Sequence, residues 1–165
     1  MEIRQATESD LPAIVEIYNQ AIAGGVSTAD LEPYTVETRR PWFENHDPQR
    51  YPIFVAIEGG AVIGWLSFSS YRGERKALRR VTEISYYLHD DWQGRGVGSQ
   101  LLAFAIEEAP RWNFRVLVAM LLSGNERSIR LLEKTGFQLW GVLPRLSDMG
   151  DRYCDHLYYG LHLEG

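Results

Sequence analysis

The sequence has almost no cysteine, with Cys154 as the single example in 165 residues. A lone cysteine excludes a disulfide within the chain and fits a reducing compartment, so we expect a cytoplasmic protein. Long hydrophobic runs are also missing, and none approaches the roughly 18 residues that a membrane helix needs. The opening residues, "MEIRQATESD", are too polar for a secretory signal. We therefore expect no membrane partner.

An excess of positive charge is absent too, because 17 lysines and arginines face 22 aspartates and glutamates, for a net charge of −5. This balance argues against nucleic-acid binding through phosphate contacts. The four histidines show no metal-ligand spacing, so no metal is expected. A hydrophobic content of 45% suits a globular protein. The length is that of one domain, which we expect to span residues 1–165.

Apolar spacing predicts strands and helices in a mixed order. Strands are expected over residues 1–7, 53–58, 61–71, 81–89, 115–122, 137–143 and 153–163, with Gly59 and Gly60 turning a hairpin. Helices are expected over 8–24, from about Thr35 with Pro41 interrupting its regularity, from 97 to about 109, and over 123–136. Strands and helices alternate only in the second half. We therefore expect an α/β protein of the α+β type, with a mixed sheet flanked by helices on both faces.

The loop "HDDWQGRGVG" holds three glycines in five residues, Gly94, Gly96 and Gly98, between a predicted strand and a predicted helix. Neither the Rossmann pattern G-x-G-x-x-G nor the Walker pattern G-K-S/T fits it. Simple turn chemistry remains open. Glycines here also let successive N–H groups point into one concavity, where the helix N-terminus and Arg95 add positive charge. The pattern favours a pyrophosphate site.

The segment "QGRGVG" resembles the Q/R-x-x-G-x-G/A signature of the GNAT superfamily of acetyl-CoA-dependent N-acetyltransferases. Downstream, "NERSIRLLEKTGF" is similar to that superfamily's N-x-x-A/S-x-x-x-Y/H-x-K-x-G-F segment. "STADLEP", "WFENHDP", "RYPIFVA", "GWLSFSSY" and "TEISYYLH" look like the phosphinothricin N-acetyltransferase-like branch. The resemblance runs from about Ile3 to Leu163. It implies a GNAT-like fold in which two adjacent strands of the sheet splay apart.

The resemblance implies acetyl-CoA as co-substrate and no metal. The pantetheine arm would lie between the splayed strands against Tyr86, Tyr87 and Leu88. The pyrophosphate would lie on the loop and helix start, which comprise Gln93, Gly94, Arg95, Gly96, Val97, Gly98 and Ser99. Asn125 and Ser128, at the start of the next helix, would also contact the cofactor. For Asn125, a simple helix cap is the alternative.

The resemblance also assigns two catalytic roles. Glu83 would be the general base, acting directly or through a water, and the Leu88 N–H would polarise the thioester carbonyl. Alternatively, Glu83 faces solvent or pairs with Arg79 or Arg80. Leu132 stands where the family has Tyr or His to protonate the departing thiolate. Leucine has no proton to donate, so the thiolate leaves unassisted or water or another residue serves.

The branch acetylates small amino-acid-like amines, namely phosphinothricin, methionine sulfone and methionine sulfoximine, and direct attack in a ternary complex is implied. Arg72 and Arg75 would bind the acceptor's carboxylate, unless they belong to a merely solvated basic loop. Leu31 and Glu32 would help to form the acceptor pocket. The family also implies a homodimer, which the aromatic C-terminal strands allow.

Two other functions stay open. One is a GNAT enzyme that acetylates a peptide N-terminus or a polyamine, although the basic segment 72–80 disfavours a polyamine. The other is a non-catalytic sensor that binds acyl-CoA, which Leu132 suggests. Release of CoA thiol with a panel of amines separates these functions.

Overall fold

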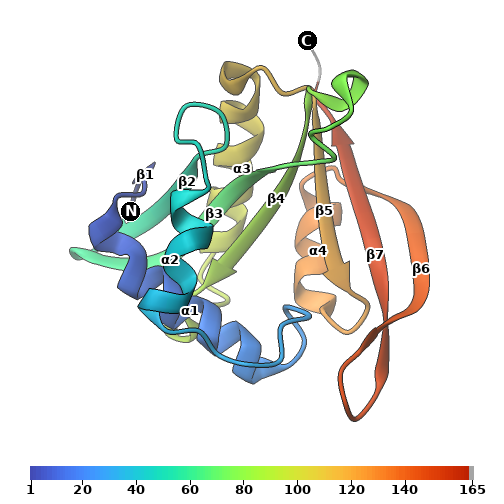
Figure 1. Ribbon diagram of the computed structural model, residues 1–165, viewed down its shortest axis with the longest axis horizontal. Coiled ribbons are helices and arrows are strands. Elements are labelled where there is room, and N and C mark those ends of the chain that lie inside the picture. The colour runs from blue at the N-terminus through green and yellow to red at the C-terminus, as the bar shows by residue number, and fades with distance from the viewer. Residues whose placement is uncertain (164–165) are drawn as a thin grey trace.

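A computed structural model describes residues 1–163. Its strands form a seven-stranded sheet in the order β1-β2-β3-β4-β5-β7-β6 (Figure 1). The strands are β1 Glu2–Gln5, β2 Ile53–Glu58, β3 Ala61–Ser70, β4 Val81–Leu88, β5 Val116–Leu122, β6 Gln138–Asp148 and β7 Tyr153–His162. The β4–β5 pair is parallel and the other neighbours are antiparallel. The predicted mixed sheet is therefore confirmed.

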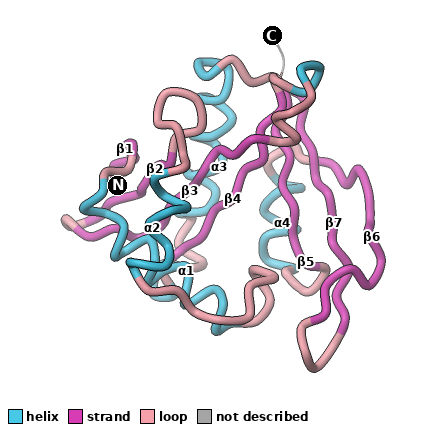
Figure 2. The backbone as a smooth tube through the Cα atoms, viewed as in Figure 1, coloured by secondary structure: helices cyan, strands magenta, loops and turns pink. Residues whose placement is uncertain are grey.

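Helices cover both faces of this sheet, as predicted (Figure 1). Helices α1 (Leu11–Gly24) and α2 (Val36–Glu44) pack on one face, in a core that includes Trp65. Helices α3 (Val97–Glu108) and α4 (Glu126–Lys134) pack on the other face, in a larger core. Because side chains alternate along a strand, each core takes every second residue of β4: Ile84, Tyr86 and Leu88 face α3 and α4, whereas Tyr87 faces α1 and α2. Figure 2 shows these layers as a backbone tube.

Glycines lie at the predicted hairpin turn between β2 and β3 and, one residue later than predicted, at the end of α1. Gly59 and Gly60 have φ of +59° and +82°, which suits the predicted hairpin turn. The left-handed residue after α1 is Gly25, with φ of +69°, rather than Gly24. Pro41 lies inside a continuous α2, which Thr35 caps by accepting a hydrogen bond from the Thr38 N–H at 3.2 Å. Pro41 is exposed on the helix surface, and its carbonyl still accepts from the Asn45 N–H at 3.0 Å.

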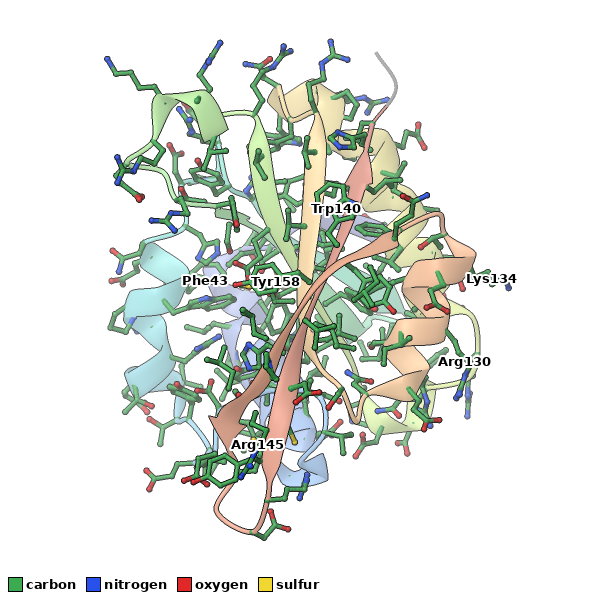
Figure 3. All side chains as sticks on the ribbon, turned by 90° about the vertical axis from the view of Figure 1, so that its right-hand side faces the viewer. Phe43, Arg130, Lys134, Trp140, Arg145 and Tyr158 are labelled. Carbon is green, nitrogen blue, oxygen red and sulfur yellow. The ribbon has the colours of Figure 1, made fainter. Side chains whose placement is uncertain are left out.

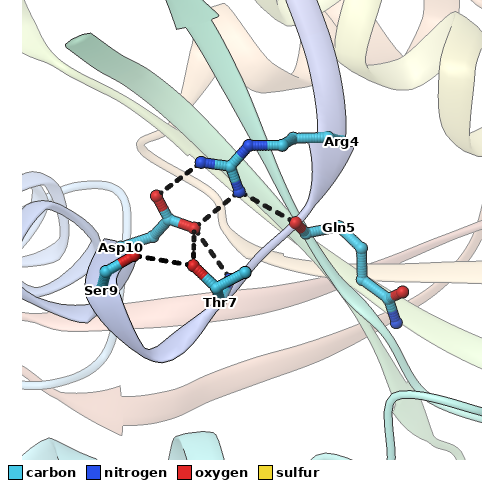
Figure 4. A network of polar contacts seen from close by, with 5 residues as sticks. All are labelled: Arg4, Gln5, Thr7, Ser9 and Asp10. Carbon is cyan, nitrogen blue, oxygen red and sulfur yellow. Dashed lines mark hydrogen bonds and ion pairs between the residues drawn. The ribbon is translucent and has the colours of Figure 1, made fainter. Parts of the chain in front are cut away.

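A buried carboxylate fixes the junction between β1 and α1 (Figure 4). Asp10 is 6% exposed and accepts two hydrogen bonds from the Arg4 guanidinium, at 2.7 and 2.9 Å. It also accepts from the backbone N–H and the hydroxyl of Thr7, at 2.8 and 3.0 Å. The hydrogen bonds from Arg4 lower the pKa of Asp10 below its ordinary value, against the opposing effect of burial. Asp10 thus stabilises the fold in its charged form.

Replacing Asp10 with Asn is expected to lower the free energy of unfolding at neutral pH by about 2 kcal/mol, because it weakens hydrogen bonds to a charged group. Since the folded-state pKa is the lower one, Asp10 stabilises the fold above its unfolded pKa, and this stabilisation is lost as the pH falls through its folded pKa. Denaturant unfolding at several pH values measures both effects. The matched control is Glu8→Gln, since Glu8 is exposed beside Arg40 and little change is expected. A constant Asp10→Asn penalty down to acid pH would contradict the assignment.

The C-terminal hairpin forms the far edge of the sheet. The β6 strand continues to Asp148, beyond the predicted end at residue 143, and its pairing with β7 shifts register between Leu143 and Ser147. Figure 3 shows this hairpin crossing the front of the molecule, with Trp140 on β6. The two strands of the hairpin expose large apolar side chains: Leu139, Trp140, Val142, Leu143, Leu146 and Tyr153. Among residues 1–163 there is no helix long and apolar enough to cross a membrane.

Candidate active site

The sheet splits between its two parallel strands. Pairing of β4 with β5 begins at Val81 opposite Val116 and ends at Glu83 opposite Val118. Beyond that point β4 stays paired with β3 as far as Leu88, and β5 stays paired with β7 as far as Leu122. The two strands therefore diverge while each keeps its other neighbour. This is the splay that the family resemblance implies.

Backbone polar groups line this split. The His89 N–H donates to the Ile63 carbonyl at 2.9 Å, so the residues of β4 that bond to β3 are the odd-numbered ones. By the same alternation, the N–H and C=O of Tyr86 and Leu88 point away from β3 and into the split. Strand pairing has ended there, so these groups lack a strand partner within the described chain. An extended ligand chain can pair with them as an added strand would.

A cavity of about 460 Å³ occupies the split, and α1 and α4 form part of its walls. Of the residues predicted to bind the cofactor, it is lined by Tyr86, Tyr87, Leu88, Gln93, Asn125 and Ser128. The remaining ones, Gly94 to Ser99, lie next to Gln93 outside the lining. The sequence did not indicate the walls supplied by α1 and the following loop, among them Gln20 and Ser27, or by Met120 of β5. No local motif marks them.

The glycine loop has the backbone that its sequence predicts. Gly94 and Gly96 have φ of +74° and +82°, in the left-handed region that favours glycine. Gly96 is the N-cap of α3, and the Gln100 N–H donates to its carbonyl at 3.1 Å. The first-turn amides of Val97, Gly98 and Ser99 therefore precede the helical hydrogen-bond pattern and are available to an anion. The loop can hold a phosphate group at the end of the split.

Arginines flank this loop. The Arg95 guanidinium lies 5.1 Å from the ring centre of Trp92. Arg127, in the first turn of α4, hydrogen-bonds the side chain of Gln93, which also donates to Asp90 at 2.9 Å. These contacts connect the loop after β4 to the start of α4 across one end of the cavity. Two positive charges are thereby close to the amides that favour an anion.

Asn125 both caps α4 and faces the cavity. Its side-chain oxygen accepts from the Ser128 N–H at 3.3 Å, so the capping alternative is correct as far as it goes. The residue is 9% exposed and belongs to the cavity lining. Its amide group has no hydrogen bond to residues 1–163, which leaves two donors for a ligand. Capping and ligand binding are therefore compatible at this residue.

Glu83 lies at the closed end of the split, next to the cavity residue Ile84 but outside the cavity lining itself, on the same side of β4 as Tyr87. It is half-buried, and within the described chain it has no ion pair with Arg79, Arg80 or any other residue. Arg80 instead bonds to Asn113, at 3.0 Å. Burial raises the pKa of Glu83 above the ordinary carboxyl value. An unpaired carboxylate with a raised pKa suits a general base.

The residues predicted for the acceptor lie outside the cavity lining. Leu31 is 58% exposed, and Glu32 is exposed beside it. The side chains of Arg72 and Arg75 are 60% and 68% exposed, and their Nε atoms lie 3.5 and 3.7 Å from Glu74. The structure thus brings the cofactor residues together but leaves the four acceptor residues at the surface.

No sequence motif marks Arg39, on α2, which is enclosed by aromatic rings. Its guanidinium carbon lies 4.1, 4.5 and 4.8 Å from the ring centres of Trp42, Tyr18 and Tyr34. Its Nε is buried and has no hydrogen-bond partner within residues 1–163. Tyr18 in turn contacts the cavity residue Tyr87, with ring centres 4.9 Å apart. Cation–π contacts therefore hold the Arg39 charge against Tyr18, which itself contacts the cavity residue Tyr87.

The contacts of His46 indicate a structural role. Its Nδ1 lies 2.8 Å from the Trp42 carbonyl and its Nε2 lies 3.3 Å from the Ser69 hydroxyl. Burial lowers the pKa of His46, which keeps the ring neutral. In the part of the chain that the structure describes, no three His, Cys, Asp or Glu side chains are grouped to hold a metal ion.

Known proteins resemble this chain over its whole length. A chain from Pseudomonas aeruginosa, the L-methionine sulfoximine/L-methionine sulfone acetyltransferase, is 36% identical over 163 residues, covering 98% of this chain and 94% of that protein. The L-amino acid N-acyltransferase MnaT of Escherichia coli is 34% identical over 164 residues, covering 99% and 95%.

One similar solved structure contains bound acetyl-CoA. The phosphinothricin acetyltransferase of Sinorhizobium meliloti, in complex with AcCoA, is 30% identical with a TM-score of 0.91, covering 98% of this chain and 88% of that one. The model of the Acetyltransferase (GNAT) family matches residues 11–137, which include the split strands, the glycine loop and α4. The chain belongs to the GNAT family of acetyltransferases, in the branch of the phosphinothricin and methionine sulfoximine acetyltransferases.

Proposed function

We propose that this acetyltransferase moves the acetyl group of acetyl-CoA to the primary amine of a small amino acid or analogue, of the phosphinothricin, methionine sulfone or methionine sulfoximine type. The observation that carries this proposal is the split between β4 and β5, which combines unpaired strand amides with an anion-binding loop at one end and an unpaired carboxylate at the other. The names of the relatives support the class of acceptor.

The two substrates would meet in a ternary complex. Glu83 removes a proton from the acceptor ammonium, the neutral amine attacks the thioester carbon, and the C–S bond breaks with its electron pair on sulfur. The Leu88 N–H, which points into the split, would stabilise the oxyanion. A covalent acetyl-enzyme is disfavoured because the one cysteine, Cys154, is buried in β7, outside the cavity lining.

The distance between Glu83 and Leu88 means that a water molecule must carry the proton from the amine to Glu83. Leu88 is five positions after Glu83 along β4, and each position adds about 3.3 Å to a strand, so the two backbones lie about 16 Å apart. A glutamate side chain spans only part of that distance, and Glu83 would therefore accept the proton through water. The Tyr86 N–H also points into the split and is two residues closer to Glu83, which makes it an alternative donor to the oxyanion.

Arg72 and Arg75 are proposed to bind the acceptor's carboxylate, with Leu31 and Glu32 bordering the pocket. Replacing either arginine with Ala is expected to raise KM for methionine sulfone by about threefold to tenfold, because one exposed charge-assisted contact is lost. Steady-state kinetics with methionine sulfone and with its decarboxylated amine measure the effect. The decarboxylated amine should show no change, and Arg111→Ala, in the turn that follows α3, serves as control. Equal KM changes for both amines would contradict carboxylate binding.

The proposal is tested by following CoA thiol release with an amine panel that contains these three amino acids, a polyamine and a peptide with a free N-terminus. A preference for the amino acids supports the proposal, whereas a preference for the polyamine or the peptide would identify that amine as the acceptor instead. Tight acetyl-CoA binding without thiol release from any amine would instead indicate a sensor that binds acyl-CoA. Mass spectrometry of the acetylated product excludes simple thioester hydrolysis.

We further propose that the enzyme is a cytoplasmic homodimer. The exposed apolar side chains of the β6–β7 hairpin support this, because a patch of that kind is unusual on a monomer. The acidic net charge of −5 supports the absence of a nucleic-acid partner. Light scattering coupled to size-exclusion chromatography measures the mass in solution. A wild-type protein that elutes as a monomer of 18.9 kDa would contradict the dimer.

A further inference from the structure

The departing thiolate needs a partner that Leu132 does not supply. Leu132 is 1% exposed, lines the cavity from α4 and has no polar side-chain atom. Asn125 and Ser128 line the same wall, and the Asn125 amide and the Ser128 hydroxyl remain donors there, since the helix cap uses only the Asn125 side-chain oxygen and the Ser128 N–H. Leu132 itself offers no donor to sulfur, so another residue of the cavity wall must supply it, or the thiolate leaves without one.

Tyr86 of β4 provides such a donor on the opposite wall. Its side chain packs in the core between the sheet and the α3–α4 layer, and it lines the cavity with Ser128 and Leu132. Along β4 it lies between Leu88 and Glu83, the residues at the two ends of the proposed chemistry. The position lets a side chain reach a sulfur held in the split.

The Tyr86 hydroxyl is also unsatisfied. It is buried and has no hydrogen-bond partner within residues 1–163, although buried tyrosine hydroxyls usually find one. The Ser128 hydroxyl is near enough to lower the pKa of Tyr86 as a hydrogen bond does, but the distance and angle between the two hydroxyls are not those of a formed hydrogen bond. The Tyr86 hydroxyl is closed to solvent and unsatisfied within residues 1–163, and a rotation of the side chain toward the cavity that Tyr86 lines would let it donate to a ligand.

The protonation state supports this use. Burial raises the pKa of Tyr86 to about 12, an effect that Ser128 partly offsets. The hydroxyl is therefore protonated at neutral pH. A thiol has a pKa of about 8.5, so CoA sulfur can leave as a thiolate that accepts a hydrogen bond without taking the tyrosine proton. The Tyr86 proton then stays in place for the next turnover.

We propose that the Tyr86 hydroxyl donates a hydrogen bond to the leaving sulfur of CoA and so takes the role for which Leu132 is unsuited. The new C–N bond forms and the C–S bond breaks with its electron pair on sulfur. The amine protons pass through Glu83 to solvent, and the CoA thiolate takes its proton from solvent as it leaves. This inference rests on the acetyl transfer described above.

Replacing Tyr86 with Phe is expected to slow acetyl transfer by about 10²-fold, as removal of one donor to a developing anion does. Single-turnover kinetics with saturating acetyl-CoA measure the chemical step apart from product release. The Kd for acetyl-CoA, measured by calorimetry, should change by less than about threefold. The melting temperature should not fall, because the variant removes a buried hydroxyl without a partner. Tyr51→Phe, in the same core against Phe114 and outside the cavity lining, is the matched control.

Adding Leu132→His to Tyr86→Phe places a donor on α4 and is expected to restore about a tenfold gain in rate. An unchanged rate in Tyr86→Phe would overturn the proposal. So would a slow variant that binds acetyl-CoA weakly, or one that Leu132→His fails to rescue while the double variant still folds and binds acetyl-CoA. Failure of the proposed function itself looks different, because the wild type would then release no CoA with any amine.

Discussion

Replacing Glu83 with Gln is expected to lower kcat/KM for the amine by about 10²–10⁴-fold, the usual contribution of a general base. Burial without an ion pair raises the pKa of Glu83 above the ordinary carboxyl value. Below that pKa the residue is protonated and accepts no proton, so the wild-type rate should rise with pH through it. Glutamine has the same shape and no basic oxygen, so this rise should vanish.

The pH profile of kcat/KM separates this effect from others. Titration of the amine substrate also raises the rate with pH, and that part should remain in Glu83→Gln. Glu107→Gln is the matched control, because the Glu107 side chain is 76% exposed on α3, where it forms an ion pair with Arg111 at 3.8 Å. A Glu83→Gln enzyme that keeps the wild-type profile would remove Glu83 as the base and leave its role as a buried strand carboxylate.

Replacing Gly96 with Val is expected to raise KM for acetyl-CoA by about tenfold or more, since loss of one charge-assisted hydrogen bond costs about 1.5 kcal/mol or more. Gly96 has φ of +82° at the N-cap of α3, a conformation that a β-branched residue adopts only under strain. Relief of that strain would turn the first-turn amides away from the pyrophosphate. The acetyl-CoA KM and the melting temperature are measured together.

The chain contains a close control for this variant. Gly60 also has φ of +82°, and at both positions an added Cβ has no neighbour within 4 Å. Gly60→Val should therefore destabilise the fold by a similar amount, about 1–3 kcal/mol, while it leaves the acetyl-CoA KM unchanged. Gly60 turns the β2–β3 hairpin, away from the cofactor cavity. If both variants raised KM equally, general destabilisation would explain the effect and the loop would lose its assigned role.

Local sequence determined the elements and the cofactor end of the site. Glycines with positive φ at positions 59, 60, 94 and 96 and the Asn125 cap depend on a few neighbouring residues, so their patterns are readable without the fold. Apolar periodicity likewise placed the helices and strands. The extension of β6 to Asp148 was missed because an exposed edge strand lacks the alternation of a half-buried one.

Tertiary structure alone decided where the chemistry lies within that frame. The point at which β4 and β5 separate, after Glu83 and Val118, depends on pairing between segments more than 30 residues apart. That separation turns the amides of Tyr86 and Leu88 into a binding surface, and within residues 1–163 the Tyr86 hydroxyl is buried without a partner. Sequence spacing gives the face on which a side chain lies, but burial and unpaired polar groups result from the packing of distant elements.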